Sequence, residues 1–209
     1  MAIIVDHEAR KKDILSKALT LFTQVGYADV TFQKIADRCG VTRTTLYVYY
    51  KNKRQIFMGS IKQFLLEIEN EVTRPLENEN LSATETLKQM LEIICLRCEE
   101  NIDLFKVILG YFIHLQTFEH DAHERVRRRI IRLQHHLSTI LIRGMNSGEF
   151  KNQSVKELNE IIYALFESGI FRLSVLEVPD MSGTKSTLDL LVDHMIVNPD
   201  FDETKAKAK

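Results

Sequence analysis

The sequence contains few of the residues that interrupt helices. The 209 residues include only three prolines, Pro75, Pro179 and Pro199. None of them interrupts a strong apolar pattern of 3.6-residue period. The alternation of apolar and polar residues that marks half-buried strands is not convincing anywhere in the chain. The sequence therefore predicts an all-α protein.

Cysteine and long apolar runs are also scarce. Three cysteines, an odd number without the repeated paired spacing of a disulfide framework, indicate a reducing compartment. The longest apolar stretch, Val107 to Leu115, is interrupted by Gly110 and His114 and is too short to span a bilayer. The first residues carry only a short apolar run before charge, unlike a signal peptide. We therefore expect a soluble, cytoplasmic protein without a membrane segment.

The charge of the chain is unevenly distributed. The net charge is −1, but residues 1–58 hold ten Lys/Arg and five Asp/Glu, whereas residues 59–209 hold 18 and 24. A basic N-terminal head on an acidic body is typical of proteins that bind nucleic acid through one end.

Residues 31–53 have the spacing of two short helices joined by a sharp turn. Thr31 and Thr42 carry side-chain oxygens where each helix needs an N-cap. Gly40 supplies a positive φ for the turn, and Ala36 is small where the second helix crosses closely. The expected inward-facing residues are Ile35, Cys39, Val41, Leu46 and Tyr49. This is the helix-turn-helix pattern, whose second helix enters the DNA major groove.

Apolar stripes and end signals place the other helices. Capping boxes begin at Ser82 and Ser154, Gly26 ends the first helix, and Pro75 is expected to break the chain between head and body. The expected ranges are 8–25, 53–71, 82–100, 103–116, 121–146, 154–176 and 186–196. The polar tail, residues 198–209, is expected to be disordered.

The chain resembles the TetR/AcrR family of bacterial transcriptional regulators. The resemblance is carried by Phe22, Gly26-Tyr27, Val30-Thr31, Ile35-Ala36, Gly40-Val41 and the string TLYVYYKNK at residues 45–53, in which Tyr50 replaces the usual Phe. It implies a nine-helix architecture with a DNA-binding domain at residues 8–68 (motif about 31–50) and an effector-binding and dimerisation domain at residues 69–197. It also implies a homodimeric repressor, without cofactor or enzymatic activity, that a small-molecule effector releases from a palindromic operator.

The motif contains several candidate DNA contacts. Arg43 can make a bidentate contact to guanine, and Thr44 can reach a base or, through its methyl group, a thymine. By resemblance, Tyr47, Tyr49 and Lys53 contact phosphates. The full predicted set is Thr31, Lys34, Thr42, Arg43, Thr44, Thr45, Tyr47, Tyr49 and Lys53. Tyr49 has packing as an equally good interpretation.

The resemblance also indicates residues of the body. The last two long helices are expected to form a four-helix bundle with their symmetry mates, through Leu158, Ile162, Leu165, Gly169, Leu173, Leu188, Leu191, Val192 and Met195. The predicted effector pocket is lined by Phe64, Phe105, Leu109, Phe112 and Phe166, which are equally plausible as ordinary core.

Two clusters allow an enzyme as a remote alternative. Cys95 and Cys98 form a CxxC pair, but in the middle of a helix rather than at the N-terminus where reactive pairs lie. His120 and His123, with acidic neighbours, could bind a metal, although a helix-capping role is the better interpretation and no metal site is predicted. A DNA-binding protein that is constitutive or switched by a protein partner is the nearer alternative.

Overall fold

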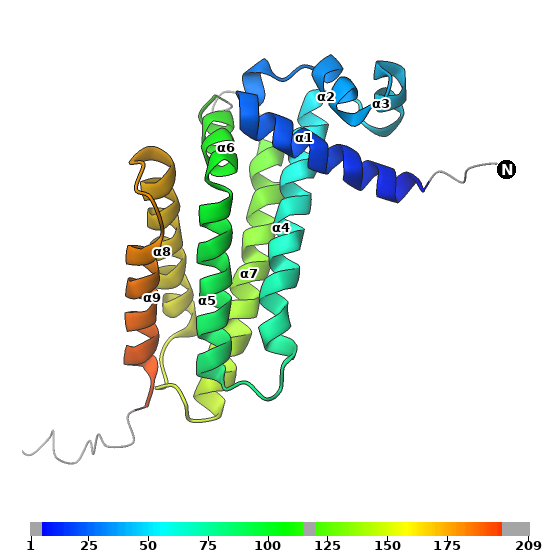
Figure 1. Ribbon diagram of the computed structural model, residues 1–209. Coiled ribbons are helices and arrows are strands. Elements are labelled where there is room, and N and C mark those ends of the chain that lie inside the picture. Colours follow the sequence, from blue (N-terminus) through cyan, green and yellow to red (C-terminus); the bar gives the residue numbers. More distant parts are fainter. Residues whose placement is uncertain (1–5, 115–119, 198–209) are drawn as a thin grey trace, which may run out of the picture. The chain divides into compact units, whose positions relative to one another are not determined.

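The computed structural model describes residues 6–114 and 120–197, and it describes their side chains except those of residues 112–130 (Figure 1). Nine helices lie in these two ranges, and no strand does, which confirms the all-α prediction. The helices are α1 (His7–Asp29), α2 (Phe32–Cys39), α3 (Arg43–Tyr49), α4 (Lys53–Glu77), α5 (Ala83–Glu100), α6 (Ile102–His114), α7 (His120–Asn146), α8 (Val155–Val175) and α9 (Ser182–Met195). The predicted disordered tail lies outside the described residues.

The chain forms two compact units. The first comprises the residues up to Ile68 and those from Asn101 to Ile130; the second comprises Glu69–Glu100 and the residues from Ile131 onward. Helix α6 thus belongs to the same unit as the N-terminal head, although the sequence assigned it to the body. The predicted functional domains, 8–68 and 69–197, stay predictions.

Three helix ends differ from the prediction. Gly26 does leave the helical conformation, with φ 80° and ψ 160°, but a further turn follows it and α1 ends at Asp29. Pro75 does not end α4, which continues to Glu77. Proline has no amide to donate to the Glu71 carbonyl four residues earlier, and the helix ends two residues after it. Helix α9 begins at Ser182, one turn before its predicted start.

An aromatic cluster fixes the core of the first unit. The ring centroids of Phe22 and Phe57 are 4.8 Å apart, and Tyr111 of α6 lies 4.8 Å from Phe57 and 4.5 Å from Tyr27. The side chain of Leu46 is fully buried in the same core. Burial of each such side chain contributes about 1.5–3 kcal/mol, so this core holds α3 in the head.

Helix-end contacts organise the second unit. The capping box at Ser82 is confirmed: its hydroxyl accepts from the Glu85 amide at 3.1 Å, and the Glu85 carboxylate accepts from the Ser82 amide at 2.9 Å. The Glu149 carboxylate accepts from the amides of Ala83 and Thr84, both at 3.0 Å. The otherwise unpaired donors of the first turn of α5 are thereby satisfied.

Candidate nucleic-acid interface

The turn between α2 and α3 has the predicted construction. Thr31 accepts from the Lys34 amide, and Thr42 accepts from the Thr45 amide, each at 3.1 Å. Gly40 adopts the left-handed conformation with φ 65°, and its amide donates to the Asp37 carbonyl at 3.1 Å. Both N-caps and the glycine turn are thus confirmed, and they set the direction in which α3 leaves α2.

The buried and exposed faces of α3 can be assigned from its own periodicity. Leu46 is fully buried against the head. Thr44 and Val48 each lie two residues from Leu46, which is about 200° around the helix axis, so both point directly away from the core. Both are exposed, Val48 to 73%. The centre of the outward face of α3 therefore consists of Thr44 and Val48.

The predicted base reader Arg43 lies on the flank of that face. Its Nη2 donates to the Tyr47 hydroxyl at 3.2 Å, and its guanidinium carbon lies 5.6 Å from the centroid of the Tyr47 ring. Tyr47 in turn stacks on Phe32 of α2, with centroids 4.4 Å apart. The stack holds the long Arg43 side chain on the helix surface before DNA is present. The readout role of Arg43 stays a prediction.

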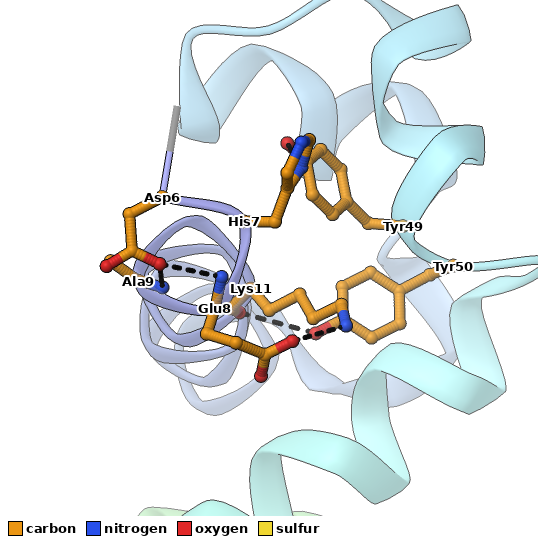
Figure 2. A network of polar contacts seen from close by, with 7 residues as sticks. All are labelled: Asp6, His7, Glu8, Ala9, Lys11, Tyr49 and Tyr50. Carbon is orange, nitrogen blue, oxygen red and sulfur yellow. Dashed lines mark hydrogen bonds and ion pairs between the residues drawn. The ribbon is translucent and has the colours of Figure 1, made fainter. Parts of the chain in front are cut away.

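Tyr49 joins the end of α3 to the start of α1 (Figure 2). Its hydroxyl lies 3.2 Å from Nδ1 of His7, and the Tyr50 hydroxyl donates to the Lys11 carbonyl at 3.3 Å. The Asp6 carboxylate accepts from the amides of Glu8 and Ala9 at 3.0 Å and begins α1 there. His7 is exposed beside a predicted phosphate contact, and the sequence does not indicate this proximity because 42 residues separate His7 from Tyr49.

Two lysines among the predicted DNA contacts have partners within the protein. Lys34 Nζ donates to the Asp29 carbonyl at 3.0 Å. Lys53 Nζ donates to the carbonyls of Tyr27 and Ala28 at 2.8 and 3.2 Å and lies 4.4 Å from the Tyr27 ring centroid. Burial lowers the pKa of the Lys53 ammonium below its ordinary value. Lys53 therefore has a structural role, and its phosphate contact stays a prediction.

The predicted dimer residues are mostly buried within their own chain. Seven of the nine have little exposure, namely Leu158, Ile162, Gly169, Leu173, Leu188, Val192 and Met195. A Cβ on Gly169 would lie 2.5 Å from Met181 of the same chain, so the close approach that this glycine permits is intramolecular. The predicted dimer set stays a prediction, and the exposed face of α8 carries other residues, namely Ile161, Ala164, Ser168, Phe171 and Val175.

The predicted effector-pocket residues are divided between the two units, and the pocket stays a prediction. Phe64 and Phe105 lie in the first unit with centroids 6.4 Å apart, whereas Phe166 belongs to the second unit. Leu109 is partly exposed, and the side chain of Phe112 lies outside the described residues. A separate hollow of about 410 Å³ lies in the second unit. Its lining is polar and consists of Glu71, Arg74, Pro75, Asn78, Leu81, Gln89, Ile93 and Arg97.

The cysteine pair does not have the environment of a redox site. Cys95 and Cys98 are buried as free thiols, and burial raises their pKa to about 11 and about 12. A reactive thiol needs the opposite shift, because the thiolate is the nucleophile. His120 and His123 have side chains outside the described part of the chain, and no metal-binding cluster is found among the side chains within it.

Comparison with known proteins agrees with this geometry. Residues 14–58 match the model of the "Bacterial regulatory proteins, tetR family". The chain is 30% identical to an uncharacterized helix-turn-helix transcriptional regulator, YvaF, of Bacillus subtilis over 111 residues, 53% of this chain and 55% of YvaF. The alignment thus spans about half the length of that relative.

Two solved structures share the fold. A TetR transcription regulator from Haloarcula marismortui superposes with a TM-score of 0.82 over 91% of this chain and 100% of its own, at 18% identity. A proposed transcriptional regulator from Saccharomonospora viridis, solved in complex with choline, gives a TM-score of 0.75 over 91% and 98%, at 22% identity.

The capped α2–α3 turn and the outward face of α3 define a helix-turn-helix protein. Residues 14–58 therefore form a DNA-binding domain of the tetR-family type, and the described helices share the nine-helix fold of solved TetR regulators. The resemblance inferred from the sequence is therefore confirmed. No helix among the described residues has the length and apolar character needed to cross a membrane.

Proposed function

We propose that this protein is a homodimeric repressor of transcription that binds a palindromic DNA operator through α3 and is released from it by a small-molecule effector. The observation that carries the proposal is the face of α3, where a rigidly capped and buried helix presents Thr44 and Val48 outward with Arg43 beside them. A helix of this kind fits the major groove, where the four base pairs can be distinguished.

Dimerisation is supported by the exposed stripe on α8. Its residues Ile161, Ala164, Ser168, Phe171 and Val175 follow one another at alternating spacings of three and four, and all are exposed. An apolar and small-residue stripe with this spacing is typical of a helix that pairs with another helix. Two paired copies double the contact surface on DNA, which a single recognition helix needs for useful specificity.

Release by an effector is supported by one structural neighbour and not by a pocket among the described residues. The neighbour from Saccharomonospora viridis binds choline, so this fold accommodates a small ligand. We propose that an effector favours a conformation in which the two recognition helices no longer match successive major grooves. Helix α4, which contributes residues to both compact units, transmits the change.

Selection of bound duplexes from random DNA tests the proposal. We expect a palindrome whose half-sites lie about one helical turn, or a multiple of it, apart. A non-palindromic or absent preference would contradict dimeric, sequence-specific binding. Thermal-shift screening with a metabolite library then separates an effector-controlled repressor from the constitutive or partner-switched alternative, because a ligand that binds the native state raises its unfolding temperature.

A further inference from the structure

We propose that Val48 is a specificity-determining residue that recognises a thymine through the C5-methyl group of the base. The inference rests on the proposed function, since it assigns one contact within the operator complex. From the sequence, direct readout is predicted for Arg43 and the neighbouring threonines, and Val48 is not among the predicted contacts.

The exposure of Val48 sets it apart from the other apolar residues of the unit. Its exposed fraction is 73%, the highest among the exposed large apolar side chains of the described chain. It lies one residue from the half-exposed Tyr47 and two residues from the fully buried Leu46. An isolated exposed valine is unremarkable on most surfaces, but this one lies at the centre of the face that the fold directs outward.

The chemistry of this position restricts what Val48 can recognise. An isopropyl group neither donates nor accepts a hydrogen bond, so it cannot read the polar edge of a guanine, cytosine or adenine. The only apolar group that a base displays in the major groove is the thymine methyl. Thr44 lies one turn earlier on the same face and offers a hydroxyl and a methyl beside it. We therefore expect the Val48 side chain to contact the C5-methyl group of a thymine.

The size of the contact follows from methyl burial. Removing one buried methyl group from the interface costs about 0.8 kcal/mol, which is about a fourfold loss of affinity. Because a palindrome contains the contact twice, removing both symmetric methyl groups is expected to weaken binding about fifteenfold.

The test combines a protein variant with a change in the DNA. The probe is the duplex that the wild-type protein selects from random DNA, prepared also with deoxyuridine at each symmetric pair of thymines, which removes the C5-methyl and leaves the base-pairing edge unchanged. Val48→Ala removes the isopropyl branches while favouring the helix. Val25→Ala is the matched control, because Val25 is also an exposed valine of the first unit, at 41%, but lies on α1.

We expect one thymine pair at which deoxyuridine weakens wild-type and Val25→Ala binding about fifteenfold but Val48→Ala binding less than twofold. Circular dichroism of each variant should show unchanged helix content. Equal losses in wild type and Val48→Ala at every thymine, or no loss at any thymine, would overturn the assignment while leaving a selected palindrome, and hence the proposed function, intact. If the wild-type protein selects no sequence at all, the proposed function fails first and the inference fails with it.

Discussion

At the scale of single residues, the predicted DNA contacts differ in how many interactions each makes within the protein. Arg43 donates a hydrogen bond to the Tyr47 hydroxyl, and the Tyr49 hydroxyl contacts His7. The side chains of Arg43 and Tyr49 are therefore positioned before DNA binds. Lys53 makes the most interactions, because its ammonium donates to two backbone carbonyls and lies over the Tyr27 ring. Its effect on DNA binding must therefore be separated from its effect on the fold.

We predict that Lys53→Ala lowers the free energy of unfolding by about 1–2 kcal/mol, because two charge-assisted hydrogen bonds and the contact with the Tyr27 ring are lost. Urea unfolding followed by circular dichroism measures the change. The matched control is Lys51→Ala, which removes the same charge from an exposed side chain two residues away. It should leave the free energy of unfolding within about 0.5 kcal/mol of wild type.

The same pair of variants tests the predicted phosphate contact. A lysine that contacts a phosphate reduces the slope of log affinity against log salt by about 1 per site when it is removed, and weakens all sequences alike. If Lys53→Ala destabilises the protein but leaves the salt slope unchanged, Lys53 acts in the fold alone. A change in base preference would contradict both roles.

At the scale of elements, the sequence predicted the helix-turn-helix best, because its determinants are local. Thr31, Gly40 and Thr42 each act on amides and carbonyls within a few residues of their own position. The stack of Arg43 and Tyr47 on Phe32 was not predictable in the same way, since it depends on how α2 and α3 are packed together. The end of α4 was predicted wrongly, because a proline marks the end of a helix only approximately and α4 continues past Pro75 to Glu77.

The two glycines that bend the chain should differ in their cost of replacement. Gly26 has φ 80° and ψ 160°, a region that essentially only glycine occupies, whereas Gly40 has the left-handed φ 65° and ψ 38° that other residues reach with strain. An added Cβ meets no atom within 4 Å at either position, so the cost comes from the backbone alone. We predict losses of about 1–3 kcal/mol for Gly26→Ala and about 1 kcal/mol for Gly40→Ala in urea unfolding.

Gly110→Ala provides the opposite case in the same unit. Gly110 lies inside α6, has no positive φ, and also has open space where a Cβ would be added. Alanine there should stabilise the protein by up to about 1 kcal/mol, because it favours the helix. If all three variants shifted stability in the same direction, backbone conformation would not be the cause.

At the scale of the whole molecule, the sequence predicted that α8 and α9 form the dimer interface, but it could not tell which side of α8 faces inward. Two different faces of α8 are apolar in sequence: one carries Ile162 and Phe166, and the other carries Ile161 and Phe171. Packing decides between them: Ile162 and Phe166 are buried against their own chain, and Ile161 and Phe171 are left outside. The proposed dimer seam is therefore an inference from the fold and not from composition.

We predict that Phe171→Arg converts the proposed dimer to monomers. A symmetric seam would bring two arginines into an apolar surface, where each loses hydration without gaining a partner. Sedimentation velocity at micromolar concentration should show the monomer. Affinity for the selected palindrome should fall by about a hundredfold or more, because the two recognition helices no longer bind as one bivalent unit.

Leu96→Arg is the matched control for this change. Leu96 of α5 and Phe171 are each 51% exposed in the second unit, so both variants place the same charge on a half-exposed apolar position. Leu96→Arg should remain dimeric and bind the palindrome as wild type does, since Leu96 is not part of the stripe on α8. If both variants dimerise normally, the seam lies elsewhere; if both become monomers, added charge rather than its location disrupts pairing. Only a monomeric Phe171→Arg together with a dimeric Leu96→Arg supports α8 as the surface that sets the spacing of the two recognition helices.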